Sequence, residues 1–397
     1  MNPHLPSPDQ GAPSQAQAVR PVCAAPAHFG MSVADIDTPA LLIDLDAFDA
    51  NLARVHAQVR EAGLAVRPHG KAHKCPDIAR RQVAAGAIGI CCQKASEAEV
   101  FAAAGITDIL ITNQLVGTPK VERAARLARQ VTLSVCVDQP LQVEQLAGAA
   151  RRHDARIGVL VEVDIGHGRC GVQTPEAVIA LAQAIRAHAP ALRFGGIHAF
   201  RGSAQHMRAP EDRAAAVDFA VRRLRTVVDA LRDAGFDCPT ITGGGTGTYA
   251  LEAASDLYTE VQPGSYVLMD TDYAANRAEP GTPALAHALH ALCTVISVRL
   301  AASGQPVHAV LDGGLKAFAV DQGLPRVDLA GWQVGTLSDE HAVIVPDGGA
   351  LPLAVGDKVR LVPSHCDPTV NLHDWLIAVR GDRVEEIWPV AARGAVF

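Results

Sequence analysis

The sequence has no uninterrupted apolar run long enough to cross a bilayer, because Gly, Arg and Asp interrupt its apolar stretches. We therefore expect no membrane span. The first thirty residues, Met1 to Gly30, are rich in Pro, Ala, Ser and Gln and lack the apolar centre of a signal peptide. They predict a flexible tail and not a targeting signal.

Basic residues are not clustered either. The chain carries 35 Lys and Arg, scattered among 42 Asp and Glu, and its formal net charge is −7. Nucleic-acid binding needs a basic face that neutralises phosphates, so we expect a small-molecule partner and no nucleic acid. With 397 residues, 49% of them hydrophobic, the chain is long enough to bury the cores of two packed domains.

The nine cysteines lack the regular spacing of a disulfide framework, and their number is odd. Most of them stand in apolar, strand-like stretches. This pattern favours reduced thiols and a cytoplasmic location.

Between about Gly63 and Asp270, short β-branched runs alternate with longer Ala/Leu/Arg segments of helical spacing. Eight strand candidates predict an α/β fold, a closed (β/α)8 barrel of the TIM type, and an open doubly wound sheet is the alternative. The candidates cover residues 65–68, 88–92, 108–112, 131–137, 157–163, 194–200, 240–243 and 259–261.

After about Leu285 the pattern changes to β-rich segments separated by Gly, Pro and Asp turns, which predicts a second, all-β domain. An early apolar segment, residues 40–45, is a strand candidate that could pair with either domain. The expected organisation is a flexible tail over 1–34, the barrel over 35–284 and the β domain over 285–397.

In such a barrel the catalytic groups follow the carboxyl ends of the strands. Lys71 stands there, after a stretch that Pro68 keeps extended. We expect its amine to lie in the barrel mouth, where burial and nearby cations would lower its pKa and suit it to bond with a carbonyl cofactor. Lys74 is the alternative, and an ordinary surface lysine is the other interpretation.

A glycine-rich run, residues 243–248, follows the seventh strand candidate. Its backbone N–H groups, with the hydroxyl of Thr246, are suited to cradle a phosphate, and late loops of such barrels are the usual phosphate site. A tight strand-to-helix turn without a ligand is the other interpretation. Gly264, Ser265 and Tyr266, after the last strand, offer a second set of donors.

In the β domain, His365 and Asp367 form a His-x-Asp pair. If this segment is a strand, residues two apart share a face and grip one cation, with Mn²⁺, Mg²⁺ or Zn²⁺ as suitable ions. The alternative is a buried His–Asp hydrogen bond without metal.

Taken together, these stretches resemble the D-threonine aldolase family, within the alanine-racemase-like enzymes that use pyridoxal phosphate (PLP) and include 3-hydroxy-D-aspartate aldolases and D-serine dehydratases. The likeness runs from about Asp35 to Phe397. It rests on residues 37–39 (DTP), 67–74 (RPHGKAHK), 89–94 (GICCQK), 168–172 (GRCGV), 243–247 (GGGTG) and 364–369 (SHCDPT).

The resemblance implies a role for each candidate residue and a homodimer in which the β domain of one subunit closes the barrel mouth of the other. The implied roles are Lys71 as the lysine that holds PLP, Arg169 at the pyridine nitrogen, Gly245, Thr246, Gly264, Ser265 and Tyr266 around the phosphate, His206 as acid or base, and His365 with Asp367 as ligands of Mn²⁺ or Mg²⁺.

The sequence departs from the family at residues 198–201 (HAFR), where members commonly have Gln-Ala-Tyr followed by His or Gln. Phe200 lacks the phenol of that tyrosine. Arg201 adds a cation near the strand end, which would favour a substrate with a β-carboxylate.

The expected reaction is the cleavage of D-3-hydroxy amino acids to glycine and an aldehyde, with the metal lowering the pKa of the 3-hydroxyl. Dehydration of D-serine or D-3-hydroxyaspartate is the nearest alternative. The Asp in His-x-Asp favours the aldolase, because the dehydratases of this class resemble zinc enzymes with a Cys at that position. A PLP-binding protein without catalysis is the remaining alternative.

Overall fold

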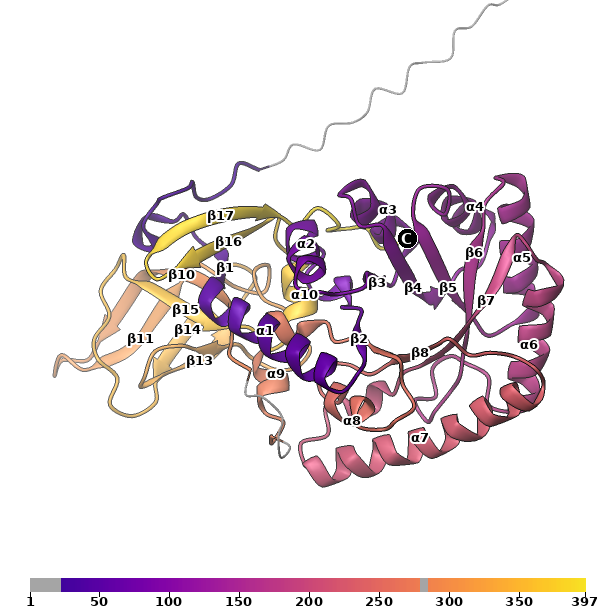
Figure 1. Ribbon diagram of the computed structural model, residues 1–397. Helices are drawn as coiled ribbons and strands as arrows, with labels where there is room; N and C mark the ends of the chain where they lie inside the picture. The colour runs from indigo at the N-terminus through magenta and orange to yellow at the C-terminus, as the bar shows by residue number, and fades with distance from the viewer. Residues whose placement is uncertain (1–22, 279–284) are drawn as a thin grey trace, which may run out of the picture.

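The computed structural model describes residues 23–278 and 285–397. A helix-wrapped barrel occupies the right of Figure 1 and a β-rich domain the left. Within these two stretches, no helix is both long enough and apolar enough to span a membrane.

The barrel is an eight-stranded, all-parallel sheet in the order β2-β9-β8-β7-β6-β5-β4-β3. It curls so that its end strands meet through a parallel bridge between His69 and Cys91, which confirms the TIM-type prediction over the open sheet. The strands are β2 (Ala65–Val66), β3 (Ile90–Cys92), β4 (Asp108–Gln114), β5 (Thr132–Val137), β6 (Ile157–Glu162), β7 (Leu192–Ala199), β8 (Thr240–Gly243) and β9 (Glu260–Val261).

Helices cover the outside of this sheet, and five of them have proline in the first turn, where its missing N–H costs no hydrogen bond. The helices are α1 (Leu45–Glu61), α2 (Pro76–Ala84), α3 (Ala95–Ala103), α4 (Thr118–Leu127), α5 (Pro140–Arg152), α6 (Pro175–Ala187), α7 (Pro210–Asp233), α8 (Tyr249–Ala253) and α9 (Thr271–Ala274). Short 3-10 turns η2 (Gly70–Ala72), η3 (Gly202–Ala204) and η4 (Ser265–Val267) follow β2, β7 and β9.

The main core of this domain lies between the strands and their helices. Inside the barrel the apolar cluster is small and consists of Cys91, Leu110, Cys136 and Leu160. The interior near the carboxyl ends of the strands is therefore left to polar side chains, which build the site described below.

The β domain is a nine-stranded sheet with the main order β13-β14-β11-β10-β1-β16-β17. The early strand β1 (Ala40–Asp44) lies between β10 and β16, antiparallel to the first and parallel to the second, so residues 40–44 pair with the β domain. The other elements are β10 (Leu289–Leu300), β11 (Pro306–Leu311), β12 (Arg326–Val327), β13 (Trp332–Leu337), β14 (Ala342–Pro346), β15 (Lys358–Val362), α10 (Cys366–Val370), β16 (Trp375–Arg380) and β17 (Arg383–Pro389).

The tail predicted over residues 1–34 is described only from Cys23 onward, and its first 22 residues lie outside the described part. From Cys23 the chain runs beside the edge of the β domain. The Trp375 indole donates to the carbonyl of Cys23 at 2.9 Å, and the Gly30 N–H donates to the carbonyl of Val384 at 2.9 Å.

Candidate active site

A pocket opens in the barrel mouth at the carboxyl ends of the strands, where the sequence predicts the catalytic groups. Most of the predicted site residues line it. The lining residues are His69, Lys71, Gln93, Thr112, Arg169, His198, Phe200, Gly244, Gly245, Thr246, Gln262, Gly264, Ser265 and Tyr273.

Lys71 belongs to η2, just after β2, and its side chain is half exposed in this pocket. Its Nζ lies 3.2 Å from Oδ2 of Asp367, which comes from the β domain of the same chain. The negative charge of Asp367 raises the pKa of the Lys71 amine, so the prediction of a lowered pKa is wrong for this arrangement. The alternative, Lys74, is held outside the pocket by Glu97 at 3.6 Å.

The glycine run after β8 forms a loop that also lines the pocket. Gly244 has φ +69°, and a Cβ on Gly245 would approach Oε1 of Gln205 to 2.5 Å. That same oxygen accepts the Gly247 N–H at 3.0 Å, so Gln205 braces the loop. The Thr246 hydroxyl is buried, and within the described residues it has no hydrogen-bond partner. An unpaired buried hydroxyl beside close-packed glycines is the arrangement that an anionic group would complete.

Tyr266 does not join this set. Its ring is fully buried, and its hydroxyl lies 2.8 Å from Nε2 of His56 and 3.3 Å from Nε2 of Gln82. The Tyr266 hydroxyl thus points away from the pocket, whereas its neighbours Gly264 and Ser265 line it, and a contact of the Tyr266 backbone N–H with a phosphate stays a prediction.

Arg169 reaches the pocket from the loop after β6. Its Nη2 lies 3.9 Å from Oε1 of the buried Glu162, and its guanidinium lies 5.9 Å from the ring centre of Phe200. The loop is shaped by Asp164, whose Oδ1 accepts the N–H groups of residues 166, 167 and 168 at 2.9, 2.9 and 3.0 Å. Burial raises the pKa of Asp164, but these hydrogen bonds outweigh it and the net shift is downward.

Two buried histidines in the pocket were not singled out from the sequence. Burial lowers the pKa of His69 well below 6.5, and it also lowers that of His198, so both rings are neutral at pH 7. His69 Nε2 lies 3.1 Å from the Thr112 hydroxyl and 3.0 Å from Nε2 of Gln93. Their common signal is a polar residue at a buried strand end, and His69 stands within the 67–74 stretch quoted above.

The departure at residues 200–201 has only half of its expected effect. Phe200 lines the pocket without a phenol, as the sequence predicts. Arg201 turns toward α7, where its Nη1 donates to the carbonyl of Ala216 at 3.0 Å and its guanidinium lies 5.4 Å from the ring centre of Phe219. The expectation that Arg201 adds a cation for a β-carboxylate is therefore wrong.

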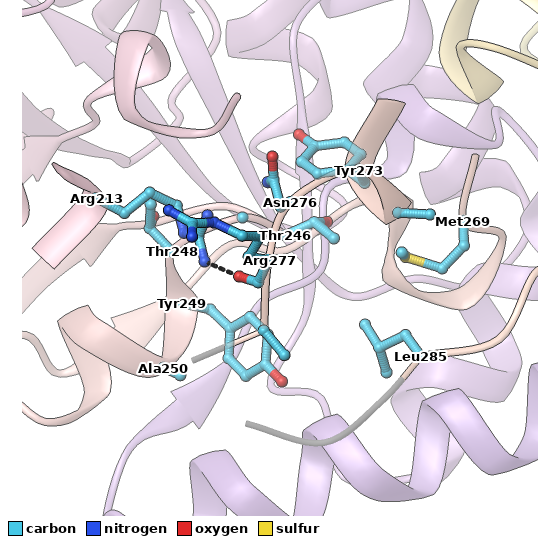
Figure 2. Close-up of a pocket in the computed structure, with 13 residues that line it drawn as sticks. Arg213, Thr246, Thr248, Tyr249, Ala250, Met269, Tyr273, Asn276, Arg277 and Leu285 are labelled. Atoms are coloured by element: carbon cyan, nitrogen blue, oxygen red, sulfur yellow. Dashed lines mark hydrogen bonds between the residues drawn. The ribbon is translucent and has the colours of Figure 1, made fainter. Parts of the chain in front are cut away.

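His206 does not line the pocket. Its Nδ1 is hydrogen-bonded to the carboxylate of Asp272, and its ring lies 5.2 Å from that of Tyr273, which does line it. Tyr273 and Thr246 also line a second cavity of about 230 Å³ (Figure 2), so these two residues form part of the wall between the two spaces. His206 therefore lies next to a lining residue, Tyr273, and does not line the pocket itself.

The His-x-Asp pair is not on a strand. β15 ends at Val362, His365 is the N-cap of α10, and Asp367 lies in the first turn of that helix. Asp367 accepts a hydrogen bond from the Ser265 hydroxyl at 3.2 Å in addition to its contact with Lys71. Burial raises the pKa of Asp367, but the positive charges of Lys71 and His365 lower it to about 2 overall. Among the residues that the structure describes, no group of three or more His, Cys, Asp or Glu gathers around one point.

Comparison with known proteins agrees with this geometry. The family model described as "Alanine racemase, N-terminal domain" matches residues 43–272, and "Putative serine dehydratase domain" matches residues 288–379. The chain is 46% identical over 370 residues to a D-threonine aldolase from an Arthrobacter species, with 93% of this chain and 96% of the relative covered. It is 44% identical over 381 residues to a 3-hydroxy-D-aspartate aldolase from Paracoccus denitrificans (strain Pd 1222), with 93% and 95% covered.

A solved structure shows the same similarity to D-threonine aldolases. The crystal structure of D-threonine aldolase from Filomicrobium marinum matches with a TM-score of 0.90 at 45% identity, over 94% of this chain and 100% of that one. The similarity therefore extends over both domains. The chain belongs to the D-threonine aldolase and 3-hydroxy-D-aspartate aldolase family of carbon–carbon lyases.

Proposed function

We propose that this protein cleaves D-3-hydroxy amino acids to glycine and an aldehyde, with PLP and a divalent metal ion as cofactors. The observation that carries the proposal is the 3.2 Å contact between Lys71 Nζ and Asp367 Oδ2. It brings the lysine implied for PLP and one donor of the implied metal pair together in one pocket.

The pocket residues fit PLP, which the family implies. The unpaired Thr246 hydroxyl and the glycine-rich loop at Gly245, which both line the pocket, suit its phosphate, and Arg169 is available for the ring nitrogen. Lys71 would hold the cofactor. Bound there, PLP supplies an electron sink for the carbanion left at Cα.

His365 and Asp367 fit a hard or borderline ion such as Mn²⁺ or Mg²⁺, because they offer one imidazole and one carboxylate and leave other coordination positions to water and substrate. Such an ion lowers the pKa of a bound hydroxyl. Before the cofactor binds, the ionised Asp367 orients the Lys71 ammonium through their ion pair.

For proton transfer we propose His206, because its Nδ1 is bonded to Asp272 and its Nε2 is left for a substrate proton. His69 is the alternative, since it lines the pocket and is neutral. Loss of activity in His69→Gln with retention in His206→Gln would assign the step to His69.

The reaction is tested by incubating the holoenzyme with D-threonine and Mn²⁺. We expect acetaldehyde and glycine in equal amounts, whereas 2-oxobutyrate would indicate the dehydratase and no turnover would indicate a PLP-binding protein without catalysis.

The visible absorbance of bound PLP is expected to disappear in Lys71→Ala. Chelation should abolish activity, and added Mn²⁺ should restore it.

The preferred substrate is tested by comparing kcat/KM for D-threonine, D-phenylserine and 3-hydroxy-D-aspartate. Because Arg201 is bonded to α7, we expect no preference for a β-carboxylate from that side chain. If 3-hydroxy-D-aspartate is nevertheless preferred, Arg169 is the pocket cation to replace first.

We further propose a cytoplasmic homodimer. All nine cysteines are free, as expected in a reducing compartment. Val320, Leu324 and Leu329, close together in the sequence between β11 and β13, are 39–47% exposed, and exposed apolar side chains are covered at subunit interfaces. Light scattering coupled to gel filtration would test the dimer.

A further inference from the structure

Asp321 lies outside the lining of the pocket, on the segment between β11 and β12. Its Oδ2 is 2.6 Å from Nδ1 of His365, 44 positions away in the sequence. The carboxylate is half exposed, and His365 is its hydrogen-bond partner. This contact attaches the implied metal ligand to a different part of the β domain.

The segment that carries Asp321 is itself fixed to the turn that carries His365. The Ala319 N–H donates to the Thr369 hydroxyl at 3.2 Å, and the Ser364 hydroxyl donates to the Ala319 carbonyl at 3.3 Å. The Thr369 hydroxyl in turn donates to the His365 carbonyl at 2.7 Å. These bonds fix Ala319, two residues before Asp321, to residues on both sides of His365, so the carboxylate is placed by the fold and not only by its own side chain.

The hydrogen bond decides which ring nitrogen of His365 is available. With Nδ1 donating its proton to Asp321, the lone pair of the neutral ring is on Nε2. In the parts of the chain that the structure covers, Nε2 of His365 has no hydrogen-bond partner. A histidine held in this way by a carboxylate is the arrangement found behind metal-bound imidazoles.

We propose that Asp321 is a positioning residue that fixes the ring orientation and tautomer of His365 so that Nε2 binds the divalent ion. The inference rests on the proposed function, because it needs His365 to be a metal ligand. It adds a residue that the sequence does not reveal, since Asp321 is far from the His-x-Asp pair along the chain.

The test measures Mn²⁺ binding to the PLP-loaded protein by calorimetry, without substrate. Removing an outer carboxylate behind a metal-bound histidine costs about 10–100-fold in affinity, so we expect Asp321→Ala to raise the Kd for Mn²⁺ by that factor. Asp321→Asn keeps an acceptor for the Nδ1 proton and should retain most of the affinity. Asp347→Ala is the matched control, because it removes an exposed carboxylate of the same domain that does not contact His365.

Thermal unfolding and the absorbance of bound PLP should be unchanged in all three variants, since neither Lys71 nor the core is altered. If Asp321→Ala binds Mn²⁺ as tightly as the wild type while His365→Ala does not bind it, the positioning role is wrong and the metal site stands. If Asp321→Asn is as weak as Asp321→Ala, the charge and not the hydrogen bond is responsible, and the tautomer role is overturned. If His365→Ala and Asp367→Ala also bind Mn²⁺ normally, the metal pair of the proposed function fails with it.

Discussion

Thr246 is a buried hydroxyl whose natural partner is a ligand. Leaving a buried polar group unpaired costs about 1–3 kcal/mol, so Thr246→Val should leave the free energy of unfolding of the cofactor-free protein unchanged or raise it. The same change should raise the Kd for PLP about tenfold, because a hydrogen bond to the phosphate is lost. Chemical denaturation and a PLP titration measure the two effects.

Thr248→Val is the matched control for this prediction. The Thr248 hydroxyl already accepts from Gln205 at 2.7 Å and donates to Glu252 at 2.8 Å. We expect its removal to lower the free energy of unfolding. Unchanged PLP affinity in Thr246→Val would contradict the phosphate role of Thr246.

At this scale the sequence predicts the residues that follow strands but not the direction of their side chains. Lys71 and Arg169 reach the pocket because backbone geometry carries them there. Tyr266 and Arg201 also follow strands, but their side chains point away from the pocket and bind other residues. Only the packing around them decides this direction. Asp321 has no local signal at all, because its role comes from a contact across 44 positions of the chain.

Among the elements, the loop after β6 depends on one carboxylate. Asp164 holds three successive N–H groups and so presents Arg169 to the pocket. Asp164→Asn should lower the free energy of unfolding by about 1–3 kcal/mol at pH 7. Asp154→Asn, in an exposed turn between α5 and β6, is the control and should have little effect.

The difference in free energy of unfolding between the wild type and Asp164→Asn should depend on pH, and the sign of this dependence is fixed. Because the pKa of Asp164 is lower in the folded protein than its ordinary 3.8, its contribution is fully present above that value and is lost as the pH falls through the folded pKa. The free energies of unfolding of the wild type and of Asp164→Asn should therefore approach each other as the pH falls below about 4. A gap that stays constant down to pH 2.5 would show that the charged form is not what stabilises the loop.

Strands of the β domain are harder to recognise from the sequence than those of the barrel. The barrel strands are recognisable because each buried run is followed by a helix with its own periodicity. β12, β13 and β17 are short or exposed on one face, and turn residues divide them from their neighbours, so their pattern is weak. A strand is expected at His365, but the structure has the start of α10 there. This helix has five residues and is too short to produce a helical periodicity in the sequence.

At the level of the whole molecule, β1 links the two domains. Leu41 is fully buried in the β-domain sheet, and three residues later Asp44 caps α1, which packs in the same core. Leu41→Ala should lower the free energy of unfolding by about 2–5 kcal/mol. It should shift both domains together, because neither keeps its packing when this strand loosens.

The chain allows the two domains to be followed separately. Its three tryptophans, Trp332, Trp375 and Trp388, all lie in the β domain, whereas nearly all helical residues lie in the barrel. Tryptophan fluorescence and far-UV circular dichroism of Leu41→Ala should therefore give coincident transitions. Separate transitions would argue against the coupling, and Leu351→Ala, at a side chain 77% exposed, should leave both unchanged.

The position of β1 also has a consequence for folding during synthesis on the ribosome. Its partners β10 and β16 begin at Leu289 and Trp375, so this strand emerges first and its sheet is completed almost last. At about 5–20 residues per second, the apolar strand waits on the order of tens of seconds for its second neighbour. During translation the apolar strand β1 therefore stays unpaired while the barrel is synthesised. It is the stretch of the nascent chain where a chaperone would be needed.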